Sequence, residues 1–270
     1  MKRKLDILTF SSISFLFLIS LSAYFFEPLY SIVYFSSVLI PILFFLCCKK
    51  NGYNYKTISL KIKKKSIFPF LLTVFPVILF VFLLSYAVSA ALTFFGYSAA
   101  SPDVSGNILL VLLKYALMPA VCEEAVFRFI PLILLAPLGN YRAALVSALF
   151  FALAHASFFS IPYAFLAGFI FFIIDAYFES LLPSLILHFF NNVASVLWMR
   201  YYNAENFRNV FLIVFVSLAL ISAVTLFLLR KRIFKKEQRS FEKERLEFGI
   251  IPSVYVIFTL GMAFINLFGG

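Results

Sequence analysis

Long, uninterrupted runs of apolar residues most strongly constrain what this chain can fold into. A helix needs about 20 apolar residues to cross the hydrocarbon core of a bilayer, and runs near that length recur from end to end. Nine segments have this character, at approximately 7–26, 29–48, 67–95, 107–136, 142–159, 161–178, 181–199, 209–229 and 249–268. Because backbone groups in lipid must bond within their own segment, we expect an all-α, polytopic transmembrane helical bundle of about eight to nine spans.

The overall composition points the same way. Hydrophobic residues make up 63% of the chain and charged residues 13%, whereas soluble domains carry about 25% charged residues. The three cysteines predict no disulfide framework. The N-terminal apolar run lacks a small-x-small cleavage site, so we expect it to be a retained helix rather than a signal peptide.

Lysine and arginine are concentrated in a few connections. Nineteen of the 23 basic residues lie at positions 2–4, 49–65, 142 and 230–245. With nine spans, all of these connections fall on one side of the membrane, which the positive-inside rule assigns to the cytoplasm. We therefore expect a cytoplasmic N-terminus, and the net charge of +11 does not indicate a nucleic-acid partner.

A few polar residues interrupt the apolar segments. An ionisable group in the middle of a membrane segment costs at least about 2.5 kcal/mol, and it is by default a candidate for a functional site. The residues concerned are Glu123, Glu124, Arg128, His155, His188 and Asn192. The chain has only two histidines, and both occur inside apolar segments.

Helical spacing separates these residues by role. Successive residues of an α-helix are about 100° apart, so Glu124 and Arg128 can form an i,i+4 ion pair while Glu123 faces the bundle interior. His188 and Asn192 share one helix face, and Asn191 points off it. We expect a chamber between the fourth, fifth and seventh segments.

This set of residues suits hydrolysis by water. A carboxylate in an apolar pocket can act as general base, which is the role expected for Glu123 with His155 as its partner. His188 and Asn192 can donate hydrogen bonds to a developing oxyanion. Cys122 adjoins Glu123 but points about 100° away, which argues against a thiol nucleophile.

The same residues carry a resemblance to a known family. The order Glu-Glu-x-x-x-Arg, Phe-x-x-x-His and His-x-x-x-Asn on successive membrane helices resembles the CAAX protease and bacteriocin-processing (CPBP, or Abi) family, which includes the type II prenyl-protein protease. Here the motifs run from Glu123 to Arg128, Phe151 to His155 and His188 to Asn192. The resemblance covers roughly 107–199. It implies an intramembrane endopeptidase in which Glu123 and His155 activate water and His188 and Asn192 form the oxyanion hole.

Metal dependence and function leave alternatives. Glu123, His155 and His188 could ligate Zn²⁺ as two histidines and a carboxylate, but water activation needs no metal and we favour a metal-free site. A non-catalytic membrane scaffold would keep the motifs as structural contacts between helices. A transporter would use the buried charges as a proton relay, although repeat symmetry is not evident.

Further expectations concern organisation and surroundings. We divide the chain into N-terminal helices with a basic loop at 1–106, a catalytic core at 107–199 and C-terminal helices at 200–270. The expected partners are membrane lipid and a peptide or protein substrate, with or without a lipid modification, in a bacterial cytoplasmic membrane. Asp175 and Glu179 are expected at a solvated helix end. Counted at 1.5 Å per residue from the cytoplasmic helix ends, His155 and His188 would lie about 21 and 10 Å deep, although one site requires similar depths.

Overall fold

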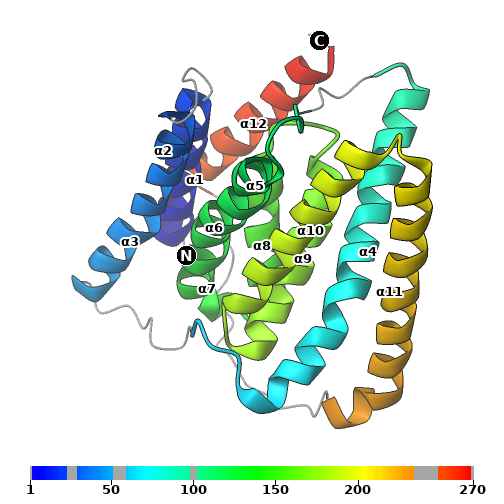
Figure 1. Ribbon diagram of the computed structural model, residues 1–270. Coiled ribbons are helices and arrows are strands. Elements are labelled where there is room, and N and C mark those ends of the chain that lie inside the picture. The colour runs from blue at the N-terminus through cyan, green and yellow to red at the C-terminus, as the bar shows by residue number, and fades with distance from the viewer. Residues whose placement is uncertain (1, 23–28, 51–58, 98–101, 234–248, 269–270) are drawn as a thin grey trace.

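The computed structural model describes residues 2–22, 29–50, 59–97, 102–233 and 249–268. Over these residues the chain is helical apart from short connections and one isolated β-bridge between Ser59 and Ser180 (Figure 1). Parts of the two large basic connections, at 51–58 and 234–248, lie outside the described residues. The expected all-α polytopic bundle is confirmed.

The helices follow the expected segments closely. Their bounds are α1 (Lys2–Ser22), α2 (Leu29–Phe35), α3 (Leu39–Lys50), α4 (Lys64–Phe94), α5 (Ile108–Leu112), α6 (Met118–Glu124), α7 (Ile130–Leu134), α8 (Asn140–Leu153), α9 (Ile161–Phe178), α10 (Leu182–Tyr201), α11 (Glu205–Ile233) and α12 (Ile250–Phe268). Short 3₁₀ segments join α2 to α3 at Ser36–Val38 and precede α8 at Ala136–Leu138.

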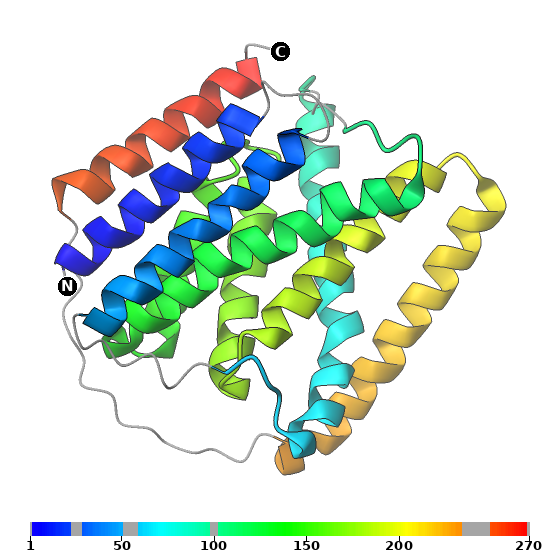
Figure 2. The ribbon, with the colours of Figure 1, turned by 60° about the vertical axis from the view of Figure 1, so that its left-hand side comes forward.

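The helices form three groups in space. Helices α5 to α10 occupy the middle, α4 and α11 pack along each other on one flank, and α1, α2, α3 and α12 cover the other flank (Figures 1 and 2). The α2–α3 segment runs beside the α5–α7 segment in both views. Segments far apart in sequence are thus brought against the central group from both sides.

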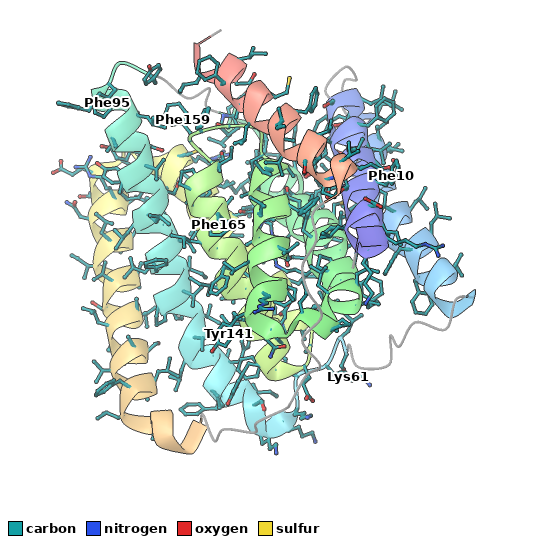
Figure 3. All side chains as sticks on the ribbon, turned by 180° about the vertical axis from the view of Figure 1, so that it is seen from behind. Phe10, Lys61, Phe95, Tyr141, Phe159 and Phe165 are labelled. Carbon is teal, nitrogen blue, oxygen red and sulfur yellow. The ribbon has the colours of Figure 1, made fainter. Side chains whose placement is uncertain are left out.

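Within the described residues, seven helical segments are long and apolar enough to cross a membrane, counting α2 and α3 as one. Large apolar side chains such as Phe10 and Phe95 project outward from the bundle (Figure 3), with 58% and 72% of their surfaces exposed. An apolar outer surface of this kind suits a lipid environment. The chain is an integral membrane protein.

The fourth expected segment is helical from 108 to 134 but contains two π-turns, at Leu113–Leu117 and Ala125–Phe129. Each π-turn ends two residues before a proline, Pro119 or Pro131. Proline has no N–H, so the carbonyl four residues earlier loses its usual partner and the local turn widens. The second π-turn begins directly after Glu124, and it therefore changes how the residues of the first motif are displayed.

The fifth expected segment, 142–159, is shorter than predicted. Helix α8 ends at Leu153 and has 14 residues, about 21 Å at 1.5 Å per residue, which is less than the roughly 30 Å of bilayer hydrocarbon. Most of its side chains are buried among other helices. It packs closely on α9 at Gly168. A Cβ added to Gly168 would lie only 2.9 Å from Phe151 Cδ1 and 3.3 Å from Ala148 Cα, both in α8. Helix α8 is thus an internal support that ends beside the site.

Candidate functional site

The first motif supplies a buried ion pair. Arg128 is 0% exposed, and its Nε lies 3.3 Å from Oε2 of Glu124. Its Nη1 donates to the carbonyl of Phe127 at 2.8 Å, and Ser147 Oγ donates to the same carbonyl at 2.6 Å. That carbonyl stands four residues before Pro131, which cannot bond to it. The kink in the fourth segment therefore provides an acceptor that helps to hold Arg128.

His188 lies between the two glutamates. Its Nδ1 donates to Glu124 Oε1 at 2.8 Å, and its Nε2 is 3.8 Å from Glu123 Oε2. We expected Glu124 to pair with Arg128 and Glu123 to face the site, and the structure places Glu124 against both Arg128 and His188. A carboxylate on Nδ1 fixes the orientation of the imidazole. His188 can donate from Nε2 at the same time only as an imidazolium.

His155 follows the end of α8 rather than lying inside a helix. Its backbone N–H donates to Ala152, and the next residue, Ala156, has a φ of +46°. The ring Nδ1 donates to the Phe151 carbonyl at 3.0 Å, because a carbonyl can only accept. When the ring is neutral, this bond leaves Nε2 as the atom able to accept a proton.

Phe151 packs at the centre of the three motifs. Its ring centroid lies 5.0 Å from that of His155 and 5.8 Å from that of His188, both edge-on. The Arg128 guanidinium lies 4.6 Å from the same centroid. This supports the packing role implied by an apolar residue at the start of the second motif.

A cavity of about 210 Å³ brings the candidate residues together. His155, His188 and Asn192 line it, so the depths counted from the helix ends do not separate the two histidines. Asn191 also contributes to its wall, although helical spacing placed it off this face. Glu123 does not line the cavity; it lies behind His188 with its side chain 13% exposed.

The remaining cavity wall is largely apolar. It comes from α4, α9 and α10, with Val81, Phe82, Tyr163, Phe171 and Met199 among its residues. Sequence reasoning did not identify the α4 contribution, because apolar residues in an apolar helix carry no signal of their own. Ser85, Tyr115 and Ser195 add hydroxyls to this wall, and a cavity that mixes apolar and polar groups suits an apolar ligand with some hydrogen-bonding groups.

Asp175 corrects one expectation. We predicted Asp175 and Glu179 at a solvated helix end, and Glu179 is indeed accessible and pairs with Lys63 at 2.9 Å. Asp175 is instead 1% exposed. Its Oδ1 accepts the Ser184 N–H at 2.8 Å in the first turn of α10. A carboxylate from α9 thus caps the helix that presents His188 one turn later.

The alternative metal set is not assembled as a group of ligands. Glu123 and His188 approach each other, but the described part of the chain contains no cluster of three or more His, Cys, Asp or Glu side chains arranged to hold a metal ion. Glu124 on Nδ1 of His188 is an arrangement that also orients metal-bound histidines. The residues as placed fit a hydrogen-bonded site rather than a three-ligand centre.

A scan of protein families identifies the middle of the chain. Residues 105–194 match the Rce1-like family of type II CAAX prenyl endopeptidases. The match confirms the resemblance expected from the motifs and covers a third of the chain. Comparison with curated proteins and with solved structures found no match.

The Rce1-like segment contains all three motifs, from Glu123 to Asn192. It does not contain α1 to α4, α11 or α12. Two features of the site therefore come from outside it: the α4 wall of the cavity and Tyr34 of α2, whose hydroxyl donates to Glu123 Oε1 at 3.2 Å. Tyr34 was not predicted, because one tyrosine among 14 in a membrane protein is not distinctive.

Proposed function

We propose that this protein is an intramembrane endopeptidase that hydrolyses a peptide bond of a membrane-associated protein or peptide. Glu123 and His155 activate a water molecule, and His188 and Asn192 stabilise the oxyanion. The Rce1-like match supports the reaction class. The one observation that carries the residue roles is that His155, His188 and Asn192 line one cavity while Glu123 Oε2 lies 3.8 Å from His188 Nε2.

The chemistry divides between two ends of the site. Glu123, assisted by the Nε2 atom of His155, accepts the proton that leaves water as it attacks the carbonyl carbon, and this proton is passed to the amine nitrogen when the C–N bond breaks. Negative charge then develops on the carbonyl oxygen, where Nε2 of an imidazolium at position 188 and the Asn192 amide are suitable donors. Glu124, which contacts both Arg128 and His188, balances the imidazolium charge.

The substrate class follows from the cavity and the family. The apolar wall from α4, α9 and α10 suits apolar side chains or a lipid-modified residue beside the scissile bond. The family name refers to prenylated CAAX proteins, so a C-terminal lipidated peptide is one class of substrate to test. The scheme above uses no metal ion, and the activity of the purified protein after treatment with a Zn²⁺ chelator tests this choice.

We place the protein in a bacterial cytoplasmic membrane with its N-terminus in the cytoplasm. Among the described basic residues, Lys63 contacts the α9–α10 connection through Glu179, at the same end as the start of α4. Arg200 lies at the other end of α10 and donates to the carbonyls of Val104 and Gly106. The predominance of basic residues at the first end favours this orientation.

Comparative proteomics of membranes tests the proposal. We expect cells with Glu123→Ala to accumulate an uncleaved precursor that wild-type cells process. Loss of a general base lowers the rate by about 10²–10⁴-fold, which is enough to make a precursor visible at steady state. Glu179→Ala is the matched control, because this carboxylate lies far from the cavity and its loss leaves cleavage intact.

Two results would contradict the proposal. If Glu123→Gln fully replaces the wild-type protein in cells, the protein is a non-catalytic scaffold, since an amide preserves the contacts of Glu123 but is not a base. Proton-coupled flux in liposomes that disappears in Glu123→Ala, without any precursor, would favour a transporter.

A further inference from the structure

Tyr34 approaches the proposed general base from outside the Rce1-like segment. It lies in α2 and is 5% exposed. Its phenol donates to Oε1 of Glu123 at 3.2 Å, across 89 positions of sequence. No motif that we derived from the sequence includes it, and the family match begins at residue 105.

Further contacts between α2 and its neighbours α1 and α6 surround the hydrogen bond between Tyr34 and Glu123. The Cys122 thiol, adjacent to Glu123, is 3.9 Å from the backbone oxygen of Tyr34. The Tyr34 ring packs edge-on against Phe15 of α1, with centroids 6.4 Å apart, and Phe15 in turn packs against Phe127 at 5.2 Å. Tyr34 is therefore held by its ring on one side and by backbone contact with α6 on the other.

The two oxygens of Glu123 have different neighbours. Oε1 accepts the Tyr34 hydroxyl, and Oε2 lies beside Nε2 of His188 at 3.8 Å. A glutamate side chain has several rotatable bonds, and without a partner for Oε1 the carboxylate can turn away from the site. A hydrogen bond to a charged acceptor is stronger than one between neutral groups and restrains this rotation.

We propose that Tyr34 is a positioning residue for the hydrolysis, which holds Oε1 of Glu123 so that Oε2 remains directed at His188 and the attacking water. The N-terminal helices then complete the active site as well as covering it. The inference rests on the proposed function, because it assigns a role to Tyr34 through Glu123.

Tyr34→Phe removes one oxygen and keeps the ring contacts. Each purified variant is reconstituted in liposomes and assayed on a synthetic peptide that spans the cleavage site of the precursor accumulating in Glu123→Ala membranes. We expect kcat to fall by about 10-fold, the lower end of what a lost hydrogen bond to a charged group supports. KM should change by less than about two-fold, because Tyr34 contacts the base and does not line the cavity.

Tyr255→Phe is the matched control. Tyr255 is also a buried tyrosine, 2% exposed, and it stacks on Phe150 away from Glu123. Its variant should keep both kcat and KM, whereas Tyr34→Phe should show the lower kcat even at temperatures well below its melting temperature in detergent. The proposal would be overturned if Tyr34→Phe alone had a lower melting temperature and regained the wild-type kcat in assays run well below that temperature. Such a result would show a structural role for Tyr34.

A second background tests whether Tyr34 acts through Glu123. Glu123→Asp withdraws the carboxylate from Tyr34 by one methylene, so adding Tyr34→Phe should lower kcat by less than about two-fold further. An undiminished 10-fold effect in that background, or equal kcat values for Tyr34→Phe and Tyr255→Phe, would overturn the proposal and leave the endopeptidase assignment standing. If Glu123→Ala membranes accumulate no precursor, the proposed function fails, and the role of Tyr34 fails with it.

Discussion

The central helices and the flanking helices satisfy their buried polar groups in different ways. In α1 and α12, buried serine and threonine hydroxyls bond to a carbonyl one turn earlier in the same helix, as Thr9 does to Leu5 at 2.8 Å and Thr259 to Tyr255 at 2.8 Å. In the central group, the buried charged and histidine side chains are instead bonded or paired between helices, as Glu124 of α6 is to His188 of α10 and Asp175 of α9 to the Ser184 N–H of α10, while Glu124 Oε2 and Asp175 Oδ2 accept no hydrogen bond. Among the described residues, the side chains concerned are Glu124, Arg128, Asp175 and His188.

The difference has a physical origin. A hydroxyl that bonds to its own helix is satisfied before the helix meets any neighbour, so α1 or α12 can enter a bilayer without a partner. A buried charge is stable only when a partner from another element reaches it. The central helices are thus interdependent, and their polar contacts specify one arrangement. A site that needs groups placed within hydrogen-bond distance benefits from that restriction.

The largest expected effect is on the buried ion pair. Arg128→Leu leaves the buried Glu124 with His188 as its remaining partner and Oε2 unpaired, and we expect the free energy of unfolding to fall by about 3 kcal/mol. Thr9→Val in α1 removes a bond within one helix and should cost at most about 1 kcal/mol. Steric trapping in bicelles measures both. Equal losses in the two variants would show that the two regions do not differ in the way described.

The next effect concerns the cap on α10. Asp175→Ala leaves the Ser184 N–H without an acceptor, and we expect a loss of about 1–2 kcal/mol in the free energy of unfolding. Asp175→Asn keeps an oxygen at the position of Oδ1 and should retain most of the stability. Glu179→Ala, at the half-buried residue that follows the end of α9, should cost less than about 0.5 kcal/mol. Thermal unfolding in detergent compares the three variants, and an Asp175→Asn protein as unstable as Asp175→Ala would contradict the capping role.

A third comparison tests the packing of the two regions. Gly168→Ala places a methyl group 2.9 Å from the Phe151 ring, and we expect it to destabilise the protein by about 1–3 kcal/mol. Gly261→Ala in α12 has no atom within 4 Å of the new Cβ and should stabilise the helix by up to about 1 kcal/mol. Opposite signs of the shift in melting temperature are the expected result. A neutral Gly168→Ala would mean that α8 and α9 separate easily, so that Phe151 is less tightly held than its contacts indicate.

Much of the fold was predictable because membrane helices have a strong local signal. The expected segment 161–178 matches α9 residue for residue, and the segments for α4, α10 and α12 differ from the observed bounds by only a few residues. Two segments differ more from the observed helices. Pro119 and Pro131 introduce the π-turns of the fourth segment, and the fifth segment ends early at Leu153.

The site was only partly predictable. Apolar context selected Glu123, His155, His188 and Asn192, and three of these line one cavity. Their catalytic roles remain predictions. Helical spacing, however, describes residues on the same helix and cannot tell which residues meet from different helices. It therefore paired Glu124 with Arg128 but did not indicate the bond to His188, and it placed Asp175 in solvent when its carboxylate caps α10.

The amino-acid sequence by itself determined that this is an α-helical membrane protein and which few polar side chains its apolar segments must accommodate. Both follow from local properties, the length of an apolar run and the cost of a charge in lipid. Only the tertiary structure decided the partners: His188 beside both glutamates, Tyr34 on Glu123, and Asp175 at the start of α10. Such contacts depend on the tilt, offset and order in which separate helices pack, and no single segment of the chain encodes these.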